Sequence, residues 1–169
     1  MNWGVMATGM IAEKFARTIS SMRSEGENIV AVGSRDKERA QAFAKQYGIE
    51  KAYGSYEELA AAPNVDAVYI ATPNNLHFEN TMLCMNAGKH ILCEKPFTTC
   101  AEDAEKLYKT ADEKGLFVME GFWTRFLPLY DELLKIIKSK QFGKLCHARC
   151  DYGFIANGVR RERKFLSEL

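Results

Sequence analysis

The stretch that decides the fold runs from residue 2 to residue 12 and reads Asn-Trp-Gly-Val-Met-Ala-Thr-Gly-Met-Ile-Ala. A short apolar segment passes here through small residues directly into a segment with helical spacing of its apolar positions. Those positions are Ile11, Phe15, Ile19 and Met22. A strand that turns at once into a helix is typical of the first turn of a dinucleotide-binding fold. An ordinary buried strand with a tight turn would give the same pattern, so the rest of the chain has to decide.

Three positions in this turn are usually small, and here they are Ala7, Gly9 and Ala12. Gly9 would let the backbone approach a pyrophosphate, and the free N–H groups at the start of the helix would bind it. Ala12 is small enough for the helix to pack on the strand, whereas Ala7 departs from the pattern because that position usually takes glycine. The residues expected to line the phosphates are therefore Ala7, Thr8, Gly9, Met10 and Ile11.

Composition limits the class of protein. The chain has 169 residues, 47% of them hydrophobic, and a net charge of +1 with acidic and basic residues interleaved. It can bury one sizeable core and begin a second unit, and neither a nucleic acid nor a membrane is indicated as a partner. Without a secretion signal or a bilayer-spanning apolar run, we expect a cytoplasmic protein. Its five cysteines include no C-x-x-C pair and its three histidines lie far apart, so structural thiols and no metal site are expected.

Compact apolar runs alternate with helical patterns along the first two thirds of the chain. The expected strands after the first are 28–33, 51–54, 66–71, 90–93 and 116–120. Helix starts are marked by Asp36 as an N-cap and by two capping boxes, one of Ser55 with Glu58 and one of Thr99 with Glu102. This alternation predicts right-handed crossovers and an α/β fold, a Rossmann doubly wound parallel sheet in the order 3-2-1-4-5-6.

Ligands of such sheets bind beyond the carboxyl ends of the strands, where the strand order reverses. This rule places six residues on one rim, namely Gly9, Arg35, Asn74, His77, Glu94 and Lys95. After the second strand a carboxylate would bind the adenosine ribose and repel a 2′-phosphate, but the chain has Ser34 and Arg35 there. The pattern therefore favours NADP over NAD, unless Arg35 is an ordinary solvated surface residue.

The pattern changes near residue 124, so we predict a dinucleotide-binding domain over 1–124 and the start of an incomplete α+β second domain over 125–169. Leu129, Leu133, Ile136 and Ile137 have the spacing of a helix, which Gly143 is expected to end. Residues 144–152 alternate as in the first strand of an antiparallel sheet. Because a lone strand is unstable, either more chain or a second copy must complete that sheet, which makes a homo-oligomer possible.

Several motifs together resemble the Gfo/Idh/MocA oxidoreductases. They are Ala-Thr-Gly-Met-Ile-Ala at 7–12, Thr-Pro-Asn-Asn-Leu-His at 72–77, Gly-Lys-His-Ile-Leu-Cys-Glu-Lys-Pro-Phe at 88–97 and Trp-Thr-Arg-Phe at 123–126. The last of these and Tyr-Gly-Ser-Tyr-Glu-Glu-Leu at 53–59 look most like the branch that contains dimeric dihydrodiol dehydrogenase and NADP-dependent D-xylose dehydrogenase. The resemblance runs essentially from end to end.

The resemblance implies roles for individual residues. Lys95 matches the catalytic lysine that touches the nicotinamide ribose and the substrate hydroxyl, and the peptide before Pro96 is often cis in relatives. Glu94 resembles the partner that orients the site. The remaining matches are cofactor-lining residues, Thr72, Asn74 and His77, and the wall beside the nicotinamide, Trp123 and Arg125. Ordinary roles also exist: Lys95 as a surface cation, His77 as a helix-start residue and Trp123 as a core aromatic.

The implied function is an NAD(P)-dependent dehydrogenase, with NADP favoured, that transfers hydride between nicotinamide and a carbon of a sugar, cyclitol or dihydrodiol. In relatives a glycine-rich stretch followed by Asp and Tyr or His supplies the acid/base. Residues 163–169 look like the segment just upstream of that stretch, and Asp151 and Tyr152 lie too early to match it. The sequence thus resembles a truncated member of the family. The alternative function is a nucleotide-binding module without catalysis.

Overall fold

The computed structural model describes residues 1–151 and 153. The chain divides into two compact units, one of residues Met1–Gly121 and one that begins at Phe122. The first unit therefore ends slightly before the boundary that we predicted at residue 124. Of the second predicted domain, 125–169, the structure describes residues 125–151 and 153.

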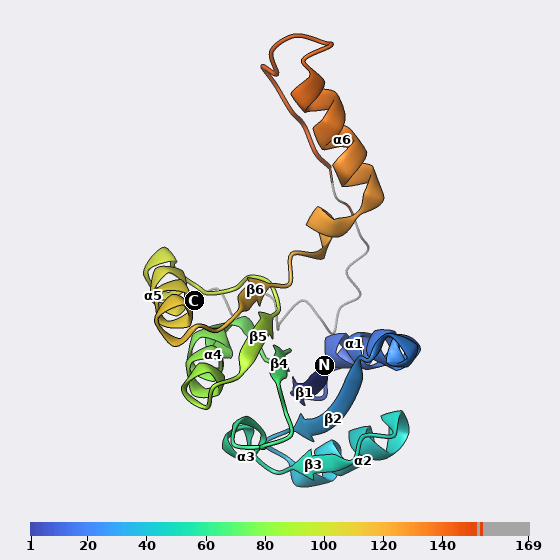
Figure 1. The fold of residues 1–169 in the computed structure, drawn as a ribbon, viewed down its shortest axis with the longest axis vertical. Coiled ribbons are helices and arrows are strands. Elements are labelled where there is room, and N and C mark those ends of the chain that lie inside the picture. Colours follow the sequence, from blue (N-terminus) through green and yellow to red (C-terminus); the bar gives the residue numbers. More distant parts are fainter. Residues whose placement is uncertain (152, 154–169) are drawn as a thin grey trace. The chain divides into compact units, whose positions relative to one another are not determined.

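Six parallel strands form the sheet of the first unit (Figure 1). They are β1 (Asn2–Met6), β2 (Asn28–Gly33), β3 (Lys51–Tyr53), β4 (Ala67–Ile70), β5 (His90–Cys93) and β6 (Val118–Glu120). Their order in the sheet is β3-β2-β1-β4-β5-β6, and each neighbouring pair is parallel. The predicted doubly wound order is confirmed, with its reversal between β1 and β4.

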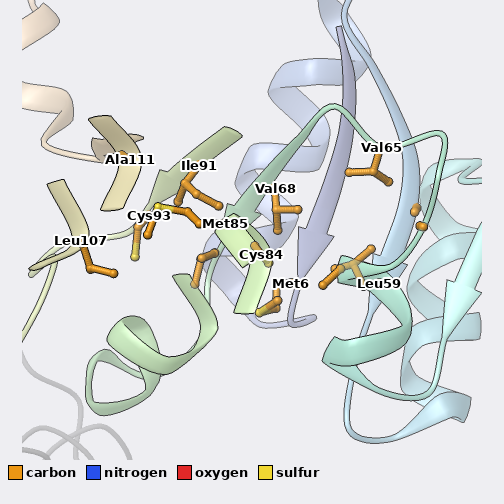
Figure 2. Close-up of a cluster of buried hydrophobic side chains, with 14 of the residues drawn as sticks. Met6, Leu59, Val65, Val68, Cys84, Met85, Ile91, Cys93, Leu107 and Ala111 are labelled. Carbon is orange, nitrogen blue, oxygen red and sulfur yellow. The ribbon is translucent and has the colours of Figure 1, made fainter. Parts of the chain in front are cut away.

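Helices cover both faces of this sheet. They are α1 (Met10–Ser21), α2 (Lys37–Tyr47), α3 (Tyr56–Ala60), α4 (His77–Asn86) and α5 (Ala101–Lys114). One core cluster joins α3, α4 and α5 to the sheet through side chains such as Leu59, Met85 and Leu107 (Figure 2). A second cluster joins α1 and α2 to the sheet through Ala16 and Phe43. Two separate cores on one sheet are what an α/β fold with crossovers on both faces requires.

The structure corrects the expected buried face of α1. Ile11 is exposed and Met22 is only half-buried, while the fully buried positions are Ala12, Ala16 and Ile19. The small alanines allow the helix axis to approach the strands closely, so the larger apolar side chains on either side of them stay at the margin. Phe15 lies at this margin and stacks on Tyr69 with ring centroids 4.0 Å apart.

Two of the three predicted helix caps are present. Asp36 Oδ1 accepts a hydrogen bond from Arg39 N at 3.2 Å, and Ser55 Oγ accepts one from Glu58 N at 3.1 Å. The third prediction, Thr99 with Glu102, is wrong, because the N-cap of α5 is the extended Cys100 and no side chain caps it. Thr99 therefore lies one residue too early for its hydroxyl to serve the first turn.

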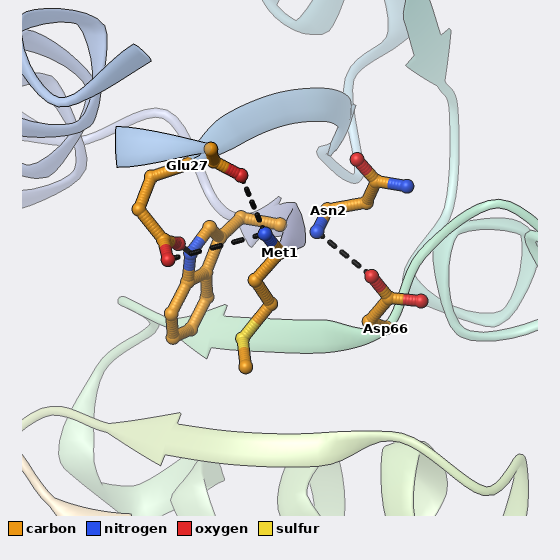
Figure 3. A network of polar contacts seen from close by, with 6 residues as sticks. Met1, Asn2, Glu27 and Asp66 are labelled. Atoms are coloured by element: carbon orange, nitrogen blue, oxygen red, sulfur yellow. Dashed lines mark hydrogen bonds and ion pairs between the residues drawn. The ribbon is translucent and has the colours of Figure 1, made fainter. Parts of the chain in front are cut away.

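Polar contacts fix the opposite end of β1 from its carboxyl end (Figure 3). The indole of Trp3 donates to Glu27 Oε2 at 2.6 Å, and the amino group of Met1 lies 3.9 Å from Glu27 Oε1. Asn2 N donates to Asp66 Oδ2 at 2.8 Å. These bonds tie the start of the central strand to residues that precede β2 and β4.

The second unit contains a short 3₁₀ turn, η3 (Trp123–Phe126), and the helix α6 (Pro128–Ser139). The helix ends earlier than predicted, because Lys140 takes a left-handed conformation at φ 56° and Gly143 belongs to the following turn. The predicted strand is absent from residues 144–151, and Tyr152 lies outside the described residues. Within that described segment no other strand is available to pair with it, so the alternating side chains alone do not produce a ladder.

Candidate functional site

The carboxyl ends of four neighbouring strands lie side by side. Met6 of β1 is in register with Gly33 of β2 and with Ile70 of β4, and Ile70 is in register with Cys93 of β5. The segments that follow these residues therefore leave the sheet at one edge. They carry the predicted site residues of the first unit, namely 7–11, 34–35, 72–77 and 94–95.

The turn after β1 is strained and open. Ala7 has a φ of +85°, a left-handed conformation that is unfavourable for any residue with a Cβ, and its N–H donates to Gly33 O at 2.9 Å. Gly9 is the N-cap of α1 and has no side chain to cap it. A Cβ added at Gly9 would meet no described atom within 4 Å. The start of a twelve-residue helix is thus accessible, as an anion-binding helix terminus requires.

The segment after β2 carries a cation and no carboxylate at its first two positions. Ser34 is buried and its hydroxyl accepts from Asp36 N at 3.2 Å, whereas Arg35 is exposed. Burial raises the pKa of the Tyr56 phenol, and the nearby guanidinium of Arg35 opposes this shift. Arg35 is therefore close to the first residue of α3, with its charge at the edge of the sheet.

The segment after β5 presents Lys95. Glu94 N continues the strand ladder by donating to Ile70 O at 3.0 Å, and the Lys95–Pro96 peptide is cis, as the resemblance implied. Lys95 is exposed, and no carboxylate among residues 1–151 and 153 forms an ion pair with its ammonium. A cation with no ion-pair partner in the described part of the chain is available to a ligand at this edge.

Glu94 is oriented by a buried phenol. Tyr69 Oη donates to Glu94 Oε1 at 2.6 Å, and Glu94 Oε2 accepts from Lys95 N at 3.3 Å. Burial raises the pKa of Tyr69 strongly, and the carboxylate of Glu94 raises it further. The phenol therefore stays protonated and keeps donating to the carboxylate beside Lys95.

His77 lies inside the protein at the first residue of α4. Its side chain is only 1% exposed, with Nδ1 2.8 Å from Pro96 O and Nε2 2.9 Å from Thr72 O. Thr72 is also buried, and its hydroxyl accepts from Asn80 Nδ2 at 3.0 Å. His77 thus joins the segment after β4 to the segment after β5. Asn74, by contrast, is half-buried in the 3₁₀ turn η2 (Asn74–Leu76).

Trp123 and Arg125 lie in the second unit, within η3. The indole of Trp123 is 57% exposed, so it is not a core aromatic in this structure. The guanidinium of Arg125 lies 5.9 Å from the ring centroid of Phe122. The structure therefore brings the predicted residues of the first unit to one edge, and it places these two in the other unit.

Two residues of this edge were missed from the sequence. The sequence pattern predicts Tyr69 as one more apolar residue of a buried strand and Glu120 as the end of the last strand. In the structure, Glu120 Oε1 accepts a hydrogen bond from Phe97 N at 2.9 Å. A hydroxyl or carboxylate in the last two positions of an otherwise apolar strand is the signal that could have identified both. Among the described residues, no group of three His, Cys, Asp or Glu side chains could hold a metal ion.

Comparison with known proteins identifies the class. The model of an oxidoreductase family with an NAD-binding Rossmann fold, GFO_IDH_MocA, matches residues 1–122. The chain belongs to this family, which confirms the resemblance found in the sequence. No helix in the described part of the chain is both long and apolar enough to cross a membrane.

Two curated relatives show which members of the family the chain is similar to. The chain is 40% identical over 161 residues to trans-1,2-dihydrobenzene-1,2-diol dehydrogenase of Mus musculus, with 95% of this chain and 48% of the relative covered. It is 43% identical over 167 residues to D-xylose 1-dehydrogenase (NADP(+)) of Hypocrea jecorina, with 93% and 43% covered. The chain thus spans about half the length of the curated relatives that it matches.

Solved structures agree with the fold. The 3-ketoreductase KijD10 from Actinomadura kijaniata in complex with NADP gives a TM-score of 0.76 at 31% identity, with 85% of this chain and 45% of that chain covered. An NAD binding oxidoreductase from Klebsiella pneumoniae gives a TM-score of 0.77 at 30% identity, with 85% and 40% covered.

Proposed function

We propose that this chain binds a nicotinamide dinucleotide along the carboxyl edge of its sheet and forms the cofactor-binding part of a dehydrogenase or reductase. The observation that supports this most is the strand register, because it brings the segments carrying Gly9, Arg35 and Lys95 to one edge. The open start of α1 fits a pyrophosphate, since helix N-termini offer N–H groups and partial positive charge.

Lys95 is proposed as the catalytic residue. The nicotinamide, when bound, would accept or donate hydride at a carbon of a sugar, cyclitol or dihydrodiol. The ammonium of Lys95 would stabilise the negative charge that develops on the oxygen attached to that carbon. Glu94 would orient the site beside it, because its carboxylate is held by Tyr69. Thr72, Asn74, Trp123 and Arg125 stay predictions as cofactor contacts, and His77 fits a supporting position better than a direct contact because it is buried.

NADP is the proposed form of the cofactor. Arg35 at the end of β2 can pair with a 2′-phosphate, and neither Ser34 nor Arg35 supplies the carboxylate that would bind the ribose of NAD. Two similar proteins have NADP in their descriptions, the xylose dehydrogenase of Hypocrea jecorina and the KijD10 complex.

Fluorescence titration with NADPH and NADH tests the cofactor. Charge-assisted hydrogen bonds contribute about 1.5–3 kcal/mol, so Arg35→Ala should weaken NADPH binding roughly 10- to 100-fold and leave NADH binding unchanged. Arg17→Ala, which removes an exposed arginine of α1, is the matched control and should change neither. Equal loss of both nucleotides in Arg35→Ala would contradict the 2′-phosphate role, and no binding of either nucleotide would refute the proposed function.

A second candidate function is a nucleotide-binding module without turnover, because the open start of α1 and the exposed Arg35 favour nucleotide binding and do not by themselves supply a chemical step. Absorbance at the reduced nicotinamide band, with D-xylose or a trans-dihydrodiol as substrate, separates the two. Turnover that Lys95→Met abolishes supports the enzyme. Binding of NADPH with no turnover on these substrates supports the module.

A homo-oligomer through the second unit also stays a prediction, as does a cytoplasmic location. The strand expected to form a shared sheet is absent from residues 144–151, and the remaining support is a row of exposed apolar side chains on α6, Leu129, Leu133 and Ile136. Light scattering tests this directly, and a monomer at all concentrations would refute it.

A further inference from the structure

The segment that carries Lys95 is held at one peptide group, the one between Pro96 and Phe97, by side chains from two other elements. His77 of α4 contacts Pro96 O at 2.8 Å, and Glu120 at the end of β6 accepts from Phe97 N at 2.9 Å. Both contacts lie within two residues of Lys95. Because each involves the main chain, together they fix the path of the backbone and not only a side chain.

The histidine of the first contact is buried. His77 is 1% exposed and its second ring nitrogen lies 2.9 Å from Thr72 O, so the imidazole spans two main-chain segments. The Phe97 side chain just beyond the second contact is buried, with its ring centroid 5.3 Å from that of Tyr108. The Pro96–Phe97 peptide is therefore bound at its carbonyl oxygen by a buried histidine and is followed directly by a buried ring.

Glu120 reaches this segment because β6 closes tightly on β5. Cys93 is in register with Glu120, and Gly121 N donates to Cys93 O at 2.6 Å. A Cβ at residue 121 would come within 3.2 Å of the same carbonyl oxygen, so a larger residue would push the end of β6 away. The carboxylate of Glu120 is thereby placed next to Phe97 N.

We propose that Glu120, acting beside His77, is a positioning residue for Lys95. The inference rests on the proposed function, since it assumes that Lys95 contacts the nucleotide. The lysine side chain is exposed and has no ion pair among the described residues, so its backbone is what determines where its ammonium reaches. A displacement of about 1 Å at a reacting group can cost about 100-fold in rate. Glu120 supplies the acceptor that fixes the peptide on the far side of Pro96.

The test compares Glu120→Ala with Glu120→Gln, because the glutamine amide oxygen can still accept from Phe97 N. Glu105→Ala removes an exposed carboxylate of α5 and is the matched control. Hydrogen exchange of the Phe97 amide, measured in ¹⁵N-phenylalanine-labelled protein, should accelerate at least about tenfold in Glu120→Ala. It should stay near the wild-type rate in the other two variants, with the Phe43 amide of α2 as the internal reference for global opening.

A double-mutant cycle then shows whether the effect passes through Lys95. Glu120→Ala should weaken NADPH binding about 5- to 10-fold in the wild-type background and by less than about twofold in the Lys95→Met background. Glu120→Gln should restore the wild-type affinity. A merely structural role would weaken binding equally in both backgrounds.

The outcomes separate this inference from the proposed function. If wild-type protein binds NADPH and Glu120→Ala weakens it equally with and without Lys95, the positioning role is overturned and the nucleotide site stands. Unchanged exchange at Phe97 in Glu120→Ala also overturns it, because the contact would then hold nothing. If wild-type protein binds no nucleotide, the proposed function fails and the positioning role for Lys95 fails with it.

Discussion

The phenol of Tyr69 donates a hydrogen bond of 2.6 Å to Glu94 Oε1. This bond links the carboxyl end of one strand to the residue next to Lys95. Tyr69 belongs to β4 and Glu94 follows β5, two neighbouring strands. The bond holds a carboxylate at a fixed position on the edge where Lys95 is exposed.

Removing this hydroxyl should destabilise the first unit. Because hydrogen bonds to charged groups contribute more than neutral ones, we expect Tyr69→Phe to lower the free energy of unfolding by about 1–2 kcal/mol. Urea denaturation followed by circular dichroism measures it. Tyr108→Phe, at a tyrosine that is 45% exposed, should change the stability by less than about 0.5 kcal/mol. Equal effects in the two variants would show that the Tyr69–Glu94 bond contributes nothing.

Replacing Ala7 by glycine should stabilise the folded protein. Its φ of +85° disfavours any residue with a Cβ, so Ala7→Gly relieves strain that exceeds the extra freedom of glycine in the unfolded chain. We expect the free energy of unfolding to rise by about 0.5 kcal/mol. The same replacement at the exposed Ala42, inside α2, should lower it by about 1 kcal/mol. Two changes of the same sign would contradict the assignment of strain to Ala7.

Lys89 is expected to be essential for stability and not for nucleotide binding. It is 8% exposed, and its ammonium donates to Ala62 O at 2.7 Å and to Val65 O at 2.8 Å. Lys89→Met would leave both carbonyls without these donors and cost about 2–4 kcal/mol in unfolding experiments. Lys109→Met, at an exposed lysine of α5, should cost less than about 0.5 kcal/mol. A loss of NADPH affinity greater than the loss of folded protein would argue against a purely structural role.

We expect the buried and the exposed cysteines to differ in their reactivity toward thiol reagents. Burial raises the pKa of Cys84 to about 12, and burial with the nearby carboxylates of Glu94 and Glu120 raises that of Cys93 to about 12. At pH 8 only about one in 10⁴ such thiols is ionised, so a disulfide reagent should modify the exposed Cys100, Cys146 and Cys150 first. The two buried thiols should react only after denaturation. Mass spectrometry of the modified protein would contradict this if Cys84 or Cys93 reacted early.

The raised pKa values of these two thiols also determine how the free energy of unfolding should change with pH. A thiol whose pKa is raised in the folded state is neutral in both states below its unfolded pKa, so it does not disfavour folding there. Above about pH 9 the unfolded state gains by losing the proton, and stability should fall between pH 9 and about pH 12. Replacing Cys84 and Cys93 by serine or alanine should remove this part of the alkaline loss.

The alternation of apolar runs and helical patterns predicted the sheet well, because each strand and each helix start is marked by residues that are close together in the sequence. The buried runs and the caps at Asp36 and Ser55 depend on residues close in the sequence, and these were confirmed. The edge that collects Arg35 and Lys95 then followed from topology alone, since parallel strands end together.

Contacts between distant residues could not be predicted in this way. Glu120 meets Phe97 across 23 positions and Lys89 meets Ala62 across 27, and only the packed structure brings them together. Glycines end α2 and α5 as the pattern predicts, at Gly48 and Gly115, but the end of α6 was predicted wrongly for a local reason. Lys140 takes the left-handed conformation that the pattern assigned to Gly143, so the backbone turned before the expected residue.

The two tryptophans of the sequence fall one to each unit, which supplies a pair of natural optical reporters. Trp3 contacts Phe15 with ring centroids 5.4 Å apart and its indole N–H is bonded to Glu27, whereas Trp123 faces solvent. Their emission should therefore differ in colour and in quenching by iodide. Variants that keep a single tryptophan would report on each unit separately during thermal unfolding and during nucleotide binding.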